Sequence, residues 1–163
     1  MSFQKLFLTF FGSGLSPKAP GTAGSLAAFI VGIGILYTLG VNTLFMLTLT
    51  ITVIAVFEIN KYETATNSHD NSEIVIDEVS GMWIAMLIVQ SVLTTVDSIA
   101  VITFGYVSSF LFFRIFDILK PSTIGWIDRE VKGGLGVMGD DVLAGIAGGL
   151  LSGLIIVVIE KII

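Results

Sequence analysis

The chain has 163 residues, of which 54% are hydrophobic and 13% are charged, and soluble domains usually carry about 25% charged residues. The net charge of −5 and the lack of a basic stripe argue against nucleic acid as a partner. Cysteine is absent and His69 is the single histidine, so disulfides, thiolate chemistry and multi-histidine zinc sites are excluded. Any metal site must therefore use oxygen ligands, which favours Mg²⁺, Mn²⁺ or Ca²⁺.

Five apolar segments predict an all-α polytopic membrane bundle. A short apolar stretch at 6–11 precedes them, and we expect it to lie at the membrane interface with Lys5 among the headgroups. The predicted spans cover residues 23–39, 44–59, 79–93, 99–116 and 142–159. Each would cover roughly 23–27 Å of helix, so flanking residues are expected to extend several helices by a turn.

A soluble bundle of buried helices is the alternative to a membrane protein. Four of the five segments are apolar around their whole circumference, however, unlike the one-sided helices at the surface of a soluble protein. No linker rich in proline, serine or charge divides the chain. Residues 1–163 are therefore expected to form a single membrane-embedded domain.

Charge is unevenly distributed among the connections. The links after the first and third segments carry little charge, whereas the links after the second and fourth segments carry most of it. With five spans, these two charged links share one side of the membrane with the N-terminus. That side carries every lysine and arginine except Lys161. The bias predicts that the charged side faces the cytoplasm.

A glycine-rich stretch at 12–25 leads into the first span. Glycines let backbone N–H groups approach a ligand closely, and a helix N-terminus adds unpaired donors and a positive dipole end. Together with the hydroxyls of Ser13, Thr22 and Ser25, this stretch could cradle a phosphate. The alternative is a simple helix start, in which Thr22 or Ser25 caps the helix and Pro20 shapes the turn before it.

Two adjacent acids, Asp77 and Glu78, stand at the mouth of the third span. Adjacent helical residues point about 100° apart, so one acid would bind a metal while the other orients water or a second ion. Two acids at a membrane boundary repel each other unless a cation is present, although they could simply complement the helix dipole. Upstream, His69 could be a proton donor or a polar loop residue, and Asp70 with Glu73 resembles a capping box.

The link between the fourth and fifth spans carries both cations and acids. Arg114 and Asp117 lie three residues apart on one helix face and could neutralise each other. Arg114 and Lys120 at the membrane edge would also suit a phosphate. These groups are expected at the same level as the acids of the third span.

A second pair of adjacent acids, Asp140 and Asp141, follows a glycine-rich run before the fifth span. Gly136 and Gly139 are expected to make this run mobile. In the simplest interpretation Asp140 is the helix N-cap and Asp141 is an acid of the first turn. Two carboxylates that face the pair of the third span are better explained by a shared hard cation. Carboxylates for Mg²⁺, with cations and N–H donors for an anion, suit phosphoryl transfer or hydrolysis.

Four stretches resemble the phosphatidylglycerophosphatase A family and occur in the order expected for it. They are F-G-S-G-L-S-P-K-A-P-G-T-A-G-S-L (11–26), H-D-N-S-E-I-V-I-D-E-V-S-G-M-W (69–83), F-R-I-F-D-I-L-K-P (113–121) and G-G-L-G-V-M-G-D-D-V-L-A-G (133–145). The resemblance implies Mg²⁺-dependent removal of the terminal phosphate monoester of phosphatidylglycerophosphate, giving phosphatidylglycerol. It also implies a multi-pass protein of the bacterial inner (cytoplasmic) membrane with a phospholipid substrate.

The resemblance also implies roles for individual residues. The implied catalytic residues and metal ligands are Asp77, Glu78, Asp140 and Asp141. A catalytic role for His69 is a further hypothesis that the resemblance does not supply. The implied substrate-binding residues are Gly21, Thr22, Ser25, Arg114, Asp117 and Lys120. Asp117 would orient Arg114 or join the metal ligands, and His69 would protonate the leaving alkoxide. Attack by an activated water is favoured over an aspartyl-phosphate, because the D-x-D-x-T/V motif is absent.

Two other classes of membrane protein are alternatives to this hypothesis. A small membrane cation transporter or channel component would place carboxylates at mid-membrane within the spans, whereas here they flank the spans. A phosphatidyl transferase acting on a CDP-activated lipid would carry a D-G-x-x-A-R signature, which is missing. Phosphate release from a lipid phosphate, with and without EDTA, separates the three classes.

Overall fold

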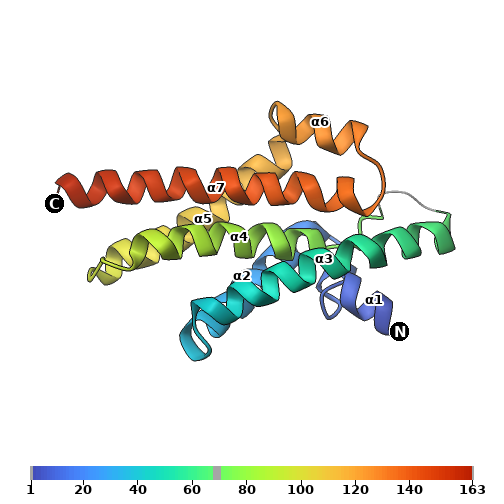
Figure 1. Cartoon of the computed structure of the whole chain (residues 1–163), viewed down its shortest axis with the longest axis horizontal. Helices are drawn as coiled ribbons and strands as arrows, with labels where there is room; N and C mark the ends of the chain where they lie inside the picture. Colours follow the sequence, from blue (N-terminus) through green and yellow to red (C-terminus); the bar gives the residue numbers. More distant parts are fainter. Residues whose placement is uncertain (1, 68–70, 163) are drawn as a thin grey trace.

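The computed structural model describes residues 2–67 and 71–162, and the secondary structure within them is helical throughout (Figure 1). The elements are α1 (Phe3–Leu8), the 3-10 helix η1 (Ser13–Leu15), α2 (Pro20–Thr38), α3 (Val41–Thr66), α4 (Ile76–Leu93), α5 (Ile99–Leu119), α6 (Thr123–Glu130) and α7 (Gly134–Ile162). Five of them, α2, α3, α4, α5 and α7, are long and apolar enough to cross a membrane. The predicted all-α membrane bundle with a short N-terminal helix is confirmed.

Helix α4 lies at the centre of the bundle and packs against α2, α3, α5 and α7. Its buried face includes Met82, Trp83 and Met86, and the Trp83 indole N–H donates to the Ala28 carbonyl of α2 at 2.8 Å. Helices in lipid gain little from hydrophobic burial, so close packing and hydrogen bonds of this kind hold them together. The bundle is thus organised around the helix that carries Asp77 in its first turn.

Small residues bring α7 close to α4 and α5. A Cβ atom at Gly145 would lie 2.2 Å from the Gly81 carbonyl oxygen, and one at Gly148 would lie 2.6 Å from the Phe113 backbone nitrogen. Any side chain at these positions would force the helices apart. The glycines of the fifth span therefore serve the close helix packing that is common in membranes.

The start of α7 differs from the prediction. The helix begins at Gly134, so Gly136 and Gly139 lie inside it and do not form a mobile run. The cause is tertiary, because the Gly134 N–H donates to the Asn60 Oδ1 atom of α3 at 2.8 Å. A Cβ atom at Gly134 would also lie 2.2 Å from the Val56 carbonyl oxygen. Contacts with α3 thus begin the helix earlier than the local sequence suggests.

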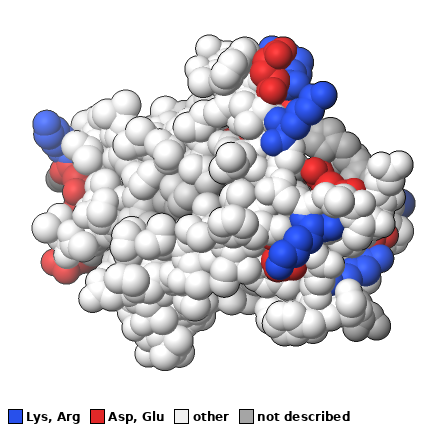
Figure 2. All heavy atoms as spheres, turned by 45° about the vertical axis from the view of Figure 1, so that its right-hand side comes forward, with Lys and Arg blue, Asp and Glu red and all other residues white. Residues whose placement is uncertain are grey.

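Charged side chains gather toward the ends of the bundle. The N-terminus and the C-terminal end of α3 lie toward one end of the molecule, and the C-terminus lies at the other (Figure 1). Figure 2 shows charged side chains gathered at the two ends of the visible face, with an uncharged band between them. The spans themselves expose apolar side chains, such as Leu49 and Val53 of α3 and Leu150 of α7. An apolar belt of this extent suits lipid and identifies a multi-pass membrane protein.

Candidate active site

A cavity of about 410 Å³ opens at the end of the bundle where α4 and α7 begin. Six carboxylates and three cationic side chains line it, together with backbone and apolar groups. The lining acids are Asp77, Glu78, Asp117, Asp128, Asp140 and Asp141, and the lining cations are Lys120, Arg129 and Lys132. An acid excess in a partly buried cavity is unfavourable unless a cation binds there.

Asp77 and Glu78 lie in the first turn of α4, as predicted. The segment before this turn is fixed by the N-terminal region: the Val75 N–H donates to the Leu8 carbonyl at 2.9 Å. Gly24 of α2 packs against the Val75 side chain, where a Cβ atom would lie 2.6 Å from the Val75 Cβ. Asp77 Oδ1 accepts a hydrogen bond from the Glu78 N–H at 3.0 Å.

Asp140 and Asp141 lie inside α7 and are 5% and 3% exposed. The predictions that Asp140 caps this helix and that Asp141 lies in its first turn are wrong, because the helix begins six residues before Asp140, at Gly134. The close packing of α7 on α4 brings Asp141 to the acids of α4. Asp77, Glu78 and Asp141 each offer one oxygen, and these oxygens lie within 4.8 Å of one another.

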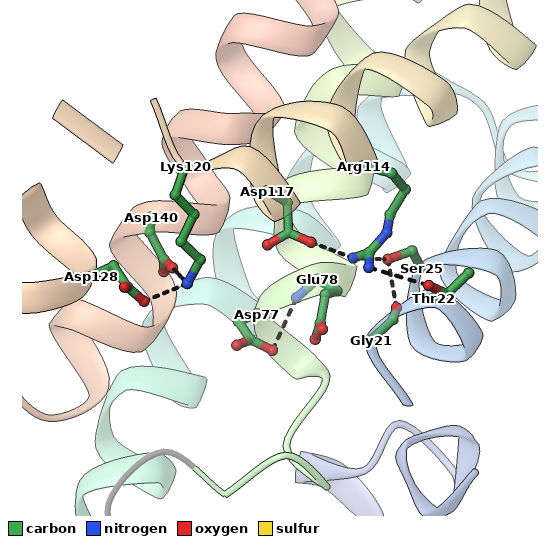
Figure 3. Close-up of polar contacts among 10 residues, drawn as sticks. All are labelled: Gly21, Thr22, Ser25, Asp77, Glu78, Arg114, Asp117, Lys120, Asp128 and Asp140. Carbon is green, nitrogen blue, oxygen red and sulfur yellow. Dashed lines mark hydrogen bonds and ion pairs between the residues drawn. The ribbon is translucent and has the colours of Figure 1, made fainter. Parts of the chain in front are cut away.

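Asp140 faces a different partner. Its Oδ2 atom accepts from the Lys120 ammonium at 2.7 Å, and the same ammonium pairs with Asp128 of α6 (Figure 3). Lys120 lies just after α5 in a left-handed backbone conformation (φ 43°). Partial burial lowers the pKa of Lys120, but its hydrogen bonds to Asp128 and Asp140 outweigh this effect and raise the pKa above the usual value. Lys120 therefore stays protonated and joins three segments at the cavity wall.

Arg114 forms the predicted ion pair with Asp117, and both side chains are largely buried. Its guanidinium also donates to Ser25 Oγ and Thr22 Oγ1, each at 3.2 Å (Figure 3). Neither hydroxyl caps α2, so that prediction is wrong: Ala19 is the N-cap residue and makes no side-chain cap bond. The two hydroxyls instead hold Arg114 against the first turns of α2.

Gly21 brings the backbone of α2 to the acid cluster. A Cβ atom at this position would lie 2.3 Å from Glu78 Oε1 and 3.6 Å from the nearer Arg114 nitrogen. Because Pro20 is the first helical residue, the N–H groups of Gly21 and Thr22 have no carbonyl of their own helix to bind. The structure thus places Gly21, Thr22 and Ser25 beside Glu78 and Arg114.

The donor set fits a hard divalent cation. Three carboxylates converge, and the buried Oε2 atom of Glu78 and Oδ1 atom of Asp140 accept no hydrogen bond within the described part of the chain. Buried carboxylate oxygens without a partner are costly, and a bound cation would satisfy them. Oxygen-only ligands suit Mg²⁺ or a similar ion. Asp77, Glu78 and Asp141 are therefore a possible metal-binding cluster, with Asp140 beside it.

Two features of the site fall outside the sequence prediction. His69 and Asp70 lie outside the described residues, and no helix begins at residue 71 or 72, so the proposed capping box does not start one there. The contribution of α6 was missed: Asp128, Arg129 and, just beyond the helix, Lys132 line the cavity. The charged run at 128–132 was the available signal, but nothing in its pattern indicated that it lines the cavity.

The fold and the cavity define a multi-pass membrane protein with an acidic, oxygen-only cluster at one end. A model of the family "Phosphatidylglycerophosphatase A" matches residues 6–156. The chain belongs to this family and is a lipid phosphatase that acts on phosphate monoesters. The alternatives of a transporter and a phosphatidyl transferase are thereby set aside.

Three relatives show how closely the chain follows the family. It is 41% identical over 138 residues to phosphatidylglycerophosphatase A of Escherichia coli, covering 83% of this chain and 73% of the relative. It is 36% identical over 137 residues to phosphatidylglycerophosphatase A of Haemophilus influenzae, covering 83% and 78%. It is 41% identical over 143 residues to a putative phosphatidylinositol-3-phosphatase of Bacteroides thetaiotaomicron, covering 85% and 84%. No solved structure was found to match the chain.

Proposed function

We propose that the protein hydrolyses the terminal phosphate monoester of phosphatidylglycerophosphate, with Mg²⁺ as its cofactor, and releases phosphatidylglycerol and phosphate. The observation that carries this proposal is the convergence of Asp77, Glu78 and Asp141 beside Arg114 at one end of the bundle. The choice of lipid rests on the names of the Escherichia coli and Haemophilus influenzae relatives.

Asp77, Glu78 and Asp141 would hold the ion, and Asp140, whose buried Oδ1 atom is unpaired, would stand beside them as a proton acceptor. When bound, Mg²⁺ would neutralise charge on the phosphate and make a nearby water more acidic. The ammonium of Lys120 keeps Asp140 fixed at the edge of this set. Lys120 thus holds one acid beside the cluster in place.

The other residues of the site would bind and orient the phosphate. Arg114 and the free N–H groups of Gly21 and Thr22 supply donors on the side of α2, and Lys120 supplies a positive charge on the side of α7. Asp117 and Ser25 fix the guanidinium plane of Arg114, so its orientation is set before substrate arrives.

Proton transfers would complete the hydrolysis. An attacking water would give its proton to the unpaired Oδ1 atom of Asp140. The leaving alkoxide would receive a proton from His69, which the sequence offers as a proton donor. Both roles are testable because Asp140→Asn and His69→Gln should lower kcat while leaving phosphate binding in place.

The site would face the cytoplasm of a bacterial inner membrane. All lysines and arginines except Lys161 lie on the side of the N-terminus in the five-span topology. This excess of positive charge marks the cytoplasmic side of bacterial membrane proteins.

Phosphate release by the purified full-length protein in mixed micelles tests the proposal. Phosphatidylglycerophosphate should be hydrolysed with Mg²⁺, excess EDTA should stop release, and added Mg²⁺ should restore it. Activity that persists in EDTA would show that hydrolysis does not require a divalent cation. A much higher kcat/KM for phosphatidylinositol 3-phosphate would instead favour the function named for the Bacteroides thetaiotaomicron relative.

A further inference from the structure

The cavity continues beyond the acid cluster to α6 and the turn that follows it. Asp128, Arg129, Val131 and Lys132 line this outer part. Asp128 lies on the opposite side of Asp77 and Glu78 from Gly21 and Arg114 (Figure 3). None of the phosphate-binding roles assigned above uses Arg129 or Lys132. The outer part therefore contains two positive charges without an assigned function.

The cations in and beside the cavity fall into two groups. Lys120, which lines the cavity, is held by Asp128 and Asp140, and Arg114, which stands beside it, is held by Asp117. Arg129 and Lys132, in contrast, form no ion pair or hydrogen bond through their side chains with any described residue. An unpaired cation that lines a cavity remains available to an anionic ligand.

The outer cations stand on an ordered segment that is anchored to the inner site. Asp128 is tied to Asp140 through the shared Lys120 ammonium, and Arg129 is the next residue of the same helix. The Val131 N–H closes the helix end by donating to the Ile127 carbonyl at 2.9 Å. The positions of Arg129 and Lys132 relative to the acid cluster are thus fixed by the fold.

The depth of this segment suits a lipid headgroup. Trp126 of α6 is 55% exposed, and Arg129 and Lys132 are exposed nearby in the chain. Tryptophan and basic side chains are typical of the membrane–water interface, where the phosphodiester of a phospholipid lies. Figure 2 shows positive and negative side chains at the end of the molecule where the cavity opens.

We propose that Arg129 and Lys132 form a second anion subsite, which binds the phosphodiester of the lipid while its terminal monoester occupies the acid cluster. The proposal rests on the proposed function, because phosphatidylglycerophosphate carries both a monoester and a diester phosphate. A two-phosphate substrate would be held at both ends, and this would select it over lipids whose only phosphate is a monoester. The subsite contributes to binding and does not touch the reacting atoms.

The test compares the Arg129→Ala/Lys132→Ala double variant with wild type and with Lys18→Ala. Lys18 is exposed and lies outside the cavity, so its variant controls for a general loss of positive surface charge. With phosphatidylglycerophosphate in mixed micelles, the double variant should raise KM about tenfold and leave kcat within about twofold, the size expected for two lost charge-assisted contacts in a partly exposed site. The Arg129→Lys/Lys132→Arg variant should restore most of the wild-type KM.

Two inhibitors show whether the KM change comes from binding of the diester or of the monoester. Phosphatidylglycerol keeps only the diester, so its inhibition constant should rise about as much as KM in the double variant. Inorganic phosphate resembles only the monoester, so its inhibition constant should not change. An unchanged KM, an equal change in Lys18→Ala, or a weaker inhibition by inorganic phosphate would each overturn the subsite. Wild type that releases no phosphate from phosphatidylglycerophosphate would instead overturn the proposed substrate, and the subsite with it.

Discussion

At the scale of single residues, Gly21 shows why a small side chain is needed beside the acid cluster. The backbone there approaches Glu78 so closely that a Cβ atom would lie 2.3 Å from Oε1. The Glu78 carboxylate is the mobile end of a side chain, so it would move and the helix would stay. Gly21 therefore sets the position of Glu78, a proposed metal ligand, without being charged itself.

The Gly21→Ala variant should lose activity and remain folded. Displacement of Glu78 should lower kcat/KM roughly 10- to 100-fold, because small misplacements of reacting groups are costly. Alanine favours helix more than glycine by up to about 1 kcal/mol, so lost helix stability would not explain the effect. Gly34→Ala, in the same helix, is the matched control, since a Cβ atom there has no neighbour within 4 Å. Equal activity of the two variants in phosphate-release assays would refute this role of Gly21.

At the scale of elements, the start of α7 depends on α3. The Asn60 side chain accepts from the Gly134 N–H and so binds one of the donors that a helix N-terminus leaves free. This bond fixes where α7 begins, and thereby the depth at which Asp140 and Asp141 stand in the helix. A polar residue in a span thus supports the site from a distance.

Replacement of Asn60 by leucine should destabilise the protein by about 1 kcal/mol, the typical net worth of one intramolecular hydrogen bond. Asn60→Asp retains the acceptor oxygen and should be closer to wild type. Thermal unfolding in a fixed detergent measures both variants. A leucine variant as stable as wild type, with unchanged activity, would show that α7 begins at Gly134 without help from α3.

The same element shows what the sequence could and could not predict. Four of the five spans were predictable because their apolar residues cover the whole helix circumference. Asp77 and Glu78 were predictable as site residues because they directly precede the third apolar segment. The early start of α7 was not predictable, because it depends on Asn60, which is far from Gly134 in the chain. The pairing of Asp140 with Lys120 and Asp128 was missed for the same reason: it depends on where α6 docks.

At the scale of the whole molecule, the five spans put the two termini on opposite sides of the membrane. The acid cavity lies on the side of the N-terminus, and the C-terminal Lys161 lies on the other (Figure 1). The orientation of the bundle therefore decides from which compartment the phosphate is removed. The Lys/Arg distribution favours the cytoplasm.

Single cysteines can determine this orientation, because the chain has no cysteine of its own. In intact bacterial cells whose outer membrane is permeabilised, a membrane-impermeant maleimide should label Lys161→Cys at once. It should label Lys18→Cys only after the inner membrane is disrupted. The reverse pattern would place the acid cavity outside the cytoplasm.

The claim on which the whole account depends is that carboxylates from α4 and α7 hold one divalent cation together. Titration of the purified protein with Mn²⁺, followed by the loss of the free-ion electron paramagnetic resonance signal, measures this directly. Glu78→Gln and Asp141→Asn should each weaken Mn²⁺ binding at least about tenfold, as loss of an anionic ligand does. Asp97→Asn, an exposed acid outside the cavity, should bind as wild type does. Wild-type affinity in both Glu78→Gln and Asp141→Asn would contradict the account.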